Sequence, residues 1–293
     1  MAKKRVGCML AYPFEAKRLV GYPKPYIVQP KLDGNRCRLI MEGGNASLLS
    51  STEELITGVP HISDYFQRLA ERNSHVYLEI DGELYRHGWD QGKINGIVSR
   101  LYTDTLDPEH EQIEFHVFDA VTDANQAGRL LFAHAFVSFV SWSHVVHVPF
   151  ELCDTYDGVI KLYNQWLKAG YEGIIVRDGS AQYKRTRSTQ MMKFKEKKKD
   201  YYKIVRGIEA ISEDGTPLGM IGAFECEDTM GSTFNVGAGR LSHAKRREYF
   251  EMLADLPGLW CKVGYQNLTA KRKVPRSGLC HHVSVEKENP EDG

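Results

Sequence analysis

The sequence contains no long hydrophobic run. None of its apolar stretches approaches the roughly 20 residues that a membrane-spanning helix requires. The N-terminal residues 1–5 lead into no apolar segment of the kind found in a signal peptide. We therefore expect neither membrane insertion nor secretion, and we predict a soluble globular protein of the cytoplasm.

Cysteine pairs and compact histidine patterns are also missing. The six cysteines include no C-x-x-C pair, and the eleven histidines include no H-E-x-x-H or similar spacing. These absences disfavour a structural zinc site and a disulfide framework. The sequence instead predicts reduced thiols.

The chain has no excess charge of either sign, with 38 Lys plus Arg against 38 Asp plus Glu. A net charge of zero does not exclude nucleic acid as a partner, because binding depends on where the charges lie. Residues 184–203 hold nine basic and two acidic residues, and residues 262–276 hold no acid. Either run alone is equally consistent with ordinary solvated surface.

Two kinds of hydrophobic periodicity divide the chain. In the first part, alternation predicts strands at residues 76–80 and 113–117, and helical spacing predicts a helix over 155–170 and a shorter one opening at Ser63. Further on, short strands are predicted at 202–210, 220–226, 233–236, 259–265 and 281–285, with one helix at 242–253. This order is typical of an OB-fold barrel. We predict two domains, residues 1–197 and 198–293.

The most specific motif is K-x-D-G-x-R at residues 31–36. It is followed in order by D-G-E-L-Y at 81–85, F-H-V-F-D at 115–119, E-G-I-I-V-R at 172–177, M-K-F-K at 192–195 and F-N-V-G-A-G at 234–239. Together these segments resemble the covalent nucleotidyltransferase superfamily, and within it the ATP-dependent DNA ligases, in particular small two-domain enzymes of viral or accessory bacterial type. The resemblance implies an α+β fold, in which an adenylation (nucleotidyltransferase) domain of antiparallel sheets flanked by helices precedes the OB-fold barrel.

The resemblance also implies a three-step reaction. Lys31 attacks the α-phosphate of ATP, AMP passes to the 5′-phosphate of a nick in duplex DNA, and the 3′-hydroxyl displaces AMP. A lysine amine attacks only when neutral, so nearby cations or burial must lower its ordinary pKa of about 10.4. Lys193 and Lys195 share one face of a strand and would supply positive charge. The catalytic residues are predicted to be Lys31, Asp33, Lys193 and Lys195.

ATP is the implied cofactor, together with Mg²⁺, for which Mn²⁺ would substitute. Phe118 has the phase of the polar residues of its strand, and the family stacks an aromatic on the adenine at this position. The predicted metal ligands are Glu172 and Glu83, since a divalent cation needs one or two carboxylates besides the phosphates. The predicted nucleotide-binding residues are Gln29, Lys31, Arg36, Glu83, Phe118, Lys193, Lys195 and Arg276.

The implied partner is nicked double-stranded DNA, bound by a monomer in the cytoplasm, or in the host cytoplasm if a virus encodes the chain. A guanidinium matches phosphate oxygens in a fork, which suits Arg36 to the 5′-phosphate. Arg177 is expected either to bind a phosphate or to brace Glu172. The predicted DNA-binding residues are Arg36, Arg38, Arg240, Lys245, Lys271, Arg272 and Lys273.

Two departures from the family pattern remove expected arginines. Residues 49–52 read L-S-S-T where many relatives have Ser-Arg, and Ser284 stands where the family has the arginine of R-x-D-K. Arg38 and Arg276 are the candidates to compensate. The alternatives are an RNA ligase, a GTP-using capping-type nucleotidyltransferase, or a noncatalytic OB-fold protein that binds nucleic acid, and a labelled nucleotide would distinguish them.

Overall fold

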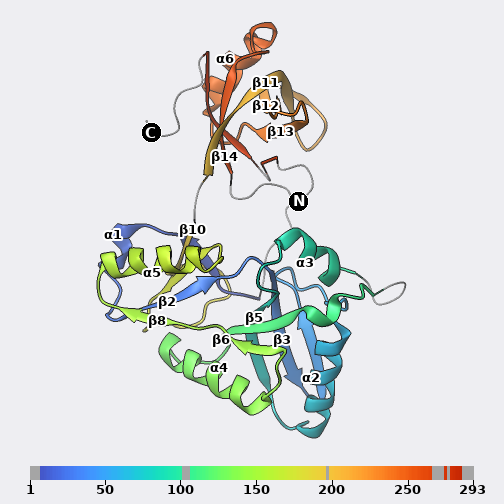
Figure 1. Cartoon of the computed structure of the whole chain (residues 1–293), viewed down its shortest axis with the longest axis vertical. Coiled ribbons are helices and arrows are strands. Elements are labelled where there is room, and N and C mark those ends of the chain that lie inside the picture. The colour runs from blue at the N-terminus through green and yellow to red at the C-terminus, as the bar shows by residue number, and fades with distance from the viewer. Residues whose placement is uncertain (1–6, 101–105, 196–197, 266–273, 276–277, 286–293) are drawn as a thin grey trace. The chain divides into compact units, whose positions relative to one another are not determined.

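The computed structural model describes residues 7–100, 106–195, 198–265, 274–275 and 278–285. The chain divides into two compact units, residues 1–195 and 196–293 (Figure 1). None of the helices that the structure describes is long and apolar enough to cross a membrane. All six cysteines are free thiols.

The first unit contains two five-stranded sheets. The first sheet has the order β1 (Leu10–Pro13), β10 (Arg187–Lys195), β9 (Gly173–Arg177), β2 (Tyr26–Lys31) and β8 (Glu151–Cys153). The second sheet has the order β4 (Asn45–Leu49), β3 (Asn35–Glu42), β5 (Leu78–Tyr85), β6 (Glu114–Ala120) and β7 (Val145–His147). Most strand pairs are antiparallel, as expected for this domain, but β1 pairs with β10 and β6 with β7 in parallel.

Each sheet of the first unit has its own hydrophobic core. Helix α5 (Tyr156–Lys168) packs on β2 and β9, where Val159 joins Val28, Ile174, Val176 and Met192 in one buried cluster (Figure 1). The Thr155 side chain caps this helix by accepting a hydrogen bond from Gly158 N at 3.0 Å, which confirms the helix expected over 155–170. Short helix α1 (Ala16–Leu19) adds Leu19 to the same cluster.

The second sheet packs against α2 (Pro60–Arg72) and α4 (Gln126–Val140), with α3 (Gln91–Val98) and the 3₁₀ turn His110–Gln112 beside it. Two sequence-based boundaries differ from the structure. Helix α2 begins at Pro60 rather than Ser63, because proline is well suited to the first turn of a helix. The strand expected from Val76 begins at Leu78, since Val76 belongs to the turn after α2.

The second unit is a closed five-stranded barrel. Its order is β11 (Lys198–Ile211), β12 (Pro217–Glu227), β13 (Thr233–Gly237), β15 (Leu279–Ser284) and β14 (Trp260–Tyr265). Helix α6 (His243–Glu251) and the 3₁₀ turn Leu253–Asp255 lie between β13 and β14, and α6 packs on β12. The five strands and single helix expected of an OB-fold are confirmed, although β11 begins four residues earlier than the alternation suggested.

Candidate active site

A cavity of about 200 Å³ lies between the two sheets of the first unit. Strands β2, β9 and β10 of the first sheet form its floor, and β3, β5 and β6 of the second sheet supply Arg36, Glu83 and Phe118. The cavity therefore brings together segments that lie far apart in the sequence. Its lining includes Gln29, Lys31, Arg36, Glu83, Phe118, Ile175, Arg177, Met191 and Lys193.

The strand register arranges the cavity floor in three rows, with one residue from each of β2, β9 and β10 in a row. Residues two apart on a strand point to the same face, so the rows share one side of the sheet. The opposite side packs beneath α5. The rows are Ile27–Arg177–Met191, Gln29–Ile175–Lys193 and Lys31–Gly173–Lys195.

The last row forms a charged cluster around Glu172. One carboxylate oxygen of Glu172 binds Lys31 Nζ, and the other accepts a hydrogen bond from Lys195 Nζ at 2.8 Å. Burial alone would raise the pKa of Glu172, but the two lysines outweigh burial and hold its pKa below the ordinary value. The structure thus joins Lys31 of β2, Lys195 of β10 and Glu172, which immediately precedes β9, three residues from separate sequence motifs.

Gly173 allows β9 and β10 to approach each other at this cluster. A Cβ on Gly173 would lie 2.2 Å from the carbonyl oxygen of Phe194 and 2.9 Å from Lys195 Cα. Its φ of +156° also falls where side chains are disfavoured. The glycine that follows Glu172 in the motif is therefore a packing requirement of the site.

Lys193 lies one row from this cluster and faces the cavity. Burial lowers the pKa of Lys193, and the positive charges of Lys195, Lys31 and Arg187 lower it further. An anion entering the cavity would therefore meet several cations at one end. This arrangement suits the phosphate groups of a nucleotide.

Arg36 and Glu83 stand on the wall that the second sheet provides. Arg36 donates from Nε and Nη2 to the two carboxylate oxygens of Asp81, at 2.6 Å and 2.5 Å, and Tyr183 also donates to Asp81 at 2.6 Å. Within the described part of the chain, no residue hydrogen-bonds the Glu83 carboxylate. Burial raises the pKa of Glu83 to about 7, although Lys31 and Arg36 act in the opposite direction.

A β-bulge places Phe118 at the cavity. Asp81 pairs with Asp119 and Gly82 pairs with Val117, so Phe118 is the extra residue between the two pairs. Its side chain is 9% exposed and lines the cavity. Gln29 Nε2 donates to the Phe118 carbonyl oxygen at 3.5 Å, which ties the wall to the floor.

Arg177 belongs to a buried polar network that the sequence did not reveal. Arg177 Nη1 donates to Asp119 at 2.9 Å and to Gln126 Oε1 at 3.0 Å, while Arg129 Nε donates to the other Asp119 oxygen at 2.8 Å. The expectation that Arg177 braces Glu172 is therefore wrong, because its carboxylate partner is Asp119. A clue was available in Asp119, the acidic residue that ends the F-H-V-F-D motif.

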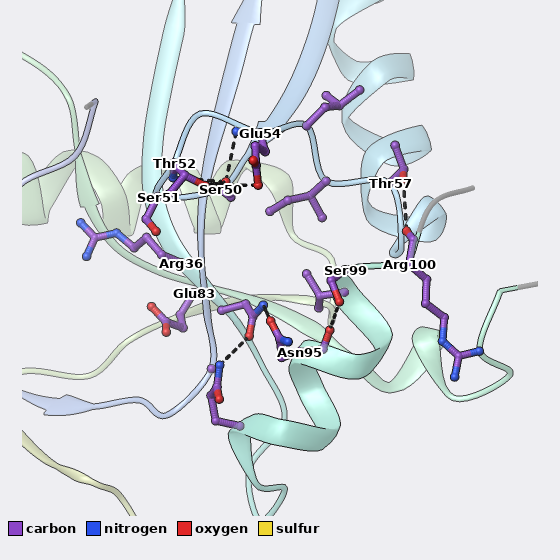
Figure 2. A pocket seen from close by; sticks show the side chains of 16 residues that line it. Arg36, Ser50, Ser51, Thr52, Glu54, Thr57, Glu83, Asn95, Ser99 and Arg100 are labelled. Atoms are coloured by element: carbon purple, nitrogen blue, oxygen red, sulfur yellow. Dashed lines mark hydrogen bonds between the residues drawn. The ribbon is translucent and has the colours of Figure 1, made fainter. Parts of the chain in front are cut away.

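A second cavity of about 710 Å³ adjoins the first and shares Arg36, Ser51 and Glu83 with it. Figure 2 shows Arg36 and Glu83 between the loop that carries Ser51 and helix α3. Hydroxyl and amide groups dominate the rest of this lining, including Ser50, Thr52, Asn95 and Ser99. Asp33 lies in the turn between β2 and β3, just before Gly34 of the same lining.

The structure corrects one predicted DNA contact and leaves others undescribed. Arg38 is 2% exposed and is paired with Glu79 and Glu53, so it would have to break these ion pairs to reach DNA. In the barrel, Arg240 and Lys245 are exposed, and Lys245 binds Glu248 at 2.7 Å. Four predicted residues lie outside the described residues: Lys271, Arg272, Lys273 and Arg276.

Comparison with known proteins identifies the family. The model of the ATP-dependent DNA ligase domain matches residues 8–195, which contain the whole cavity and all of its charged cluster. The chain belongs to the ATP-dependent DNA ligase family. Within that family, it is 28% identical over 276 residues to the DNA ligase of the Warthog/Namibia isolate of African swine fever virus, and this match covers 85% of the chain and 61% of the viral protein. The chain thus spans 61% of the length of this relative.

Solved ligase structures share the fold of this family member. One from a study of Lig E DNA ligases has a TM-score of 0.76 at 20% identity, covering 94% of this chain and 98% of that one. The bacteriophage T7 ATP-dependent DNA ligase in complex with ATP has a TM-score of 0.55 at 17% identity, covering 94% and 97%. These likenesses confirm the two-part architecture expected of the ligase family.

Proposed function

We propose that this chain is an ATP-dependent DNA ligase that seals nicks in duplex DNA through a lysyl-AMP intermediate on Lys31 and a DNA-adenylate. The observation that carries the proposal is the layout of the small cavity. Lys31 lies in a row of cations at one end, while Phe118 and Gln29 offer an aromatic face and an amide further along the floor. A nucleotide has the matching distribution, with an anionic end and an aromatic, hydrogen-bonding end.

The roles of the cavity residues follow from their positions. Phe118 stacks on the base, Gln29 accepts a hydrogen bond from its amino group, and Lys193 and Lys195 neutralise charge that develops at the α-phosphate. Lys31 is ion-paired with Glu172 in this structure, so it must leave that pair and lose a proton before it attacks.

The carboxylates fit a divalent cation that completes its coordination with phosphate oxygens and water. Within the described ranges, no group of three or more His, Cys, Asp or Glu could hold a metal. A cation held by one or two carboxylates and the substrate is typical of phosphoryl-transfer enzymes. We propose Glu83, which lines the cavity and has no hydrogen-bond partner among the described residues, and Glu172 as its protein ligands. We propose Mg²⁺ as the cation, with Mn²⁺ as a substitute. Such a cation would stabilise negative charge on the transferring group.

The proposed partner is nicked double-stranded DNA, bound by a monomer. The exposed basic residues Arg240 and Lys245 support a phosphate-binding role for the barrel. Lys271 to Lys273 and Arg276 extend this set as predictions from the sequence. In this proposal Arg36 contacts a DNA phosphate only if it is released from its ion pair with Asp81. A cytoplasmic location stays a prediction.

The deciding experiment follows a label from ATP to protein and then to DNA. The full chain is incubated with α-³²P-ATP and Mg²⁺, separated by denaturing electrophoresis, and assayed for sealing of a nicked duplex. We expect covalent labelling and sealing by the wild type. Lys31→Ala should lose the label yet still seal a nick that already carries AMP.

Lys168→Ala provides the matched control, because Lys168 is exposed at the end of α5, away from the cavity. This variant should label and seal like the wild type. Label mapped to another lysine would refute the role of Lys31. Labelling by GTP in place of ATP, or sealing confined to RNA, would favour the alternative nucleotidyltransferases.

A further inference from the structure

Three histidines from separate segments of the first unit come together outside the nucleotide cavity. His61 lies in the first turn of α2, His110 opens the 3₁₀ turn before β6, and His144 lies in the turn before β7. The ring centroids of His110 and His144 are 5.2 Å and 5.4 Å from that of His61. All three side chains are half-buried, so water and small ions can reach them.

The hydrogen bonds of His61 determine which of its ring nitrogens presents a lone pair. Its Nε2 lies 3.0 Å from the carbonyl oxygen of Ile113, which can only accept, so Nε2 carries the proton of the neutral ring. Its Nδ1 therefore has a lone pair, which faces Nδ1 of His110 at 3.1 Å. The proton between these two nitrogens belongs to His110. If that proton moves to Nε2 of the His110 ring, the two Nδ1 lone pairs can share a cation.

The separation of the two nitrogens suits a transition-metal ion. Zn–N bonds to histidine are about 2.0–2.1 Å long, so nitrogens 3.1 Å apart hold one ion at an N–Zn–N angle of about 100°. This angle lies between the values of about 90° and about 109° that octahedral and tetrahedral coordination require. The pair thus needs little movement to coordinate an ion.

The surroundings orient the His61 ring in the way that metal-bound histidines are oriented. Such histidines almost always donate their second ring N–H to a carboxylate, a carbonyl or water, and His61 already donates to Ile113. The ring of His144 packs edge-on against His61 at 74° and is itself held by the carbonyl oxygen of Glu111, 3.0 Å from its Nε2. A ring that is already oriented loses little freedom when it binds a ligand.

We propose that Nδ1 of His61 and Nδ1 of His110 together bind one divalent transition-metal ion, such as Zn²⁺, with water in its remaining positions. Among the described residues, no group of three or more His, Cys, Asp or Glu could hold a metal, so the site is open rather than closed. Imidazole ligands select Zn²⁺, Ni²⁺ and Cu²⁺ over Mg²⁺, which prefers oxygen. The ion would link the start of α2 to the turn that leads into β6. This inference is independent of the use of ATP.

Calorimetry with zinc tests the site. The full chain is stripped of metal with EDTA, dialysed into chelator-free buffer and titrated with ZnCl₂ in excess Mg²⁺, which occupies oxygen-rich sites. We expect one Zn²⁺ to bind at the histidine pair. His61→Gln and His110→Gln should each weaken this binding at least 10-fold, since even the loss of an outer partner of a ligand costs about 10- to 100-fold.

His75→Gln is the matched control, because His75 is an exposed histidine of the same unit, in the turn after α2. It should bind Zn²⁺ like the wild type. A wild type that binds no Zn²⁺, or that binds it no more tightly than His61→Gln and His110→Gln, would overturn the inference. An equal loss in His75→Gln would do the same, because zinc would then bind exposed histidines in general.

Two further measurements separate coordination from folding. Cu²⁺ also binds imidazole, and each coordinating nitrogen splits its electron paramagnetic resonance signal. The wild type should show two such nitrogens and each variant one, and an unchanged count would refute a shared ion. Melting temperatures without metal show whether each variant is folded, and the folded one decides. Zn²⁺ should raise the wild-type melting temperature reversibly, since it binds the native pair, and the absence of any rise would count against the site.

Discussion

Arg36 and Glu83 face each other across β3 and β5, yet Arg36 binds Asp81 instead. Asp81 is fully buried and accepts hydrogen bonds from Nε and Nη2 of Arg36. The Glu83 carboxylate therefore stays available at the cavity. By pairing with Arg36, Asp81 keeps Arg36 from pairing with Glu83.

Asp81→Asn should raise the divalent cation concentration needed for self-adenylation. Without its carboxylate partner, Arg36 is expected to turn to Glu83 and compete with the cation. We expect about a tenfold higher midpoint in a Mg²⁺ titration, the scale of one charge-assisted hydrogen bond. Glu225→Gln, which removes an exposed ion pair with Arg206 in the barrel, should leave the midpoint unchanged. An unaltered midpoint in folded Asp81→Asn would contradict this account.

Gly173→Ala should destabilise the first unit, because the added Cβ meets backbone atoms of β10 rather than a flexible side chain. Overpacking of this kind costs about 1–3 kcal/mol. Urea denaturation measures the loss. Gly179→Ala is the control, since its Cβ would make only an ordinary contact of 3.5 Å with Ile27. Equal stabilities for the two variants would rule out close strand approach as the role of Gly173.

His61 should make stability depend on pH. Burial lowers the pKa of His61, and His110 and His144 lower it further, against a hydrogen bond to Ile113 O and the charge of Glu111. The folded state thus binds this proton less readily than the unfolded chain. The stabilisation is complete above the unfolded pKa of about 6.5 and is lost as pH falls toward the folded value.

Melting temperatures from pH 7.5 to 5.5 test this dependence. The wild type should lose stability on acidification more steeply than His61→Gln, which cannot be protonated. His243→Gln, an exposed change on α6, should follow the wild-type slope. Parallel curves for the wild type and His61→Gln would show that His61 contributes nothing.

Binding of a nicked duplex should weaken steeply with salt. Each phosphate neutralised by a basic side chain lowers log affinity by about 0.9 per log unit of salt. Removing a true phosphate contact, as in Lys245→Ala, should reduce this slope by about one. Lys161→Ala, exposed on α5, should leave it unchanged. A flat salt response in the wild type would contradict phosphate-dominated binding.

The sequence motifs predicted the charged end of the cavity but not the buried polar network of Arg177, Asp119 and Arg129. Lys31, Glu172 and Lys195 each belong to a short motif that can be recognised in a single sequence. The strand register brings the three residues together. Arg129 reaches Asp119 through the packing of α4 on β6, and Arg177 reaches Asp119 from β9 of the other sheet. Both are long-range contacts with no local pattern.

Local patterns do not reveal where the backbone departs from regular geometry. Alternation placed Phe118 on the face of Glu114 and His116, and Phe118 does line the cavity, but the bulge at this residue cannot be read from side-chain polarity. Arg38 looked like a free cation in the sequence, and only its partners Glu79 and Glu53, on other segments, account for its burial. The barrel strand β14 was easier, because its first residues alternate between half-buried and buried positions.

The two separate cores of the first unit have a consequence for its dynamics. The cavity floor rests on the cluster beneath α5 and its wall on the cluster of the second sheet, so a bound nucleotide touches both halves. Ligand binding then links local opening events that would otherwise be independent. Amide hydrogens in β9 and in β5 should become slower to exchange together when ATP is added, although the nucleotide contacts only a few residues of either strand.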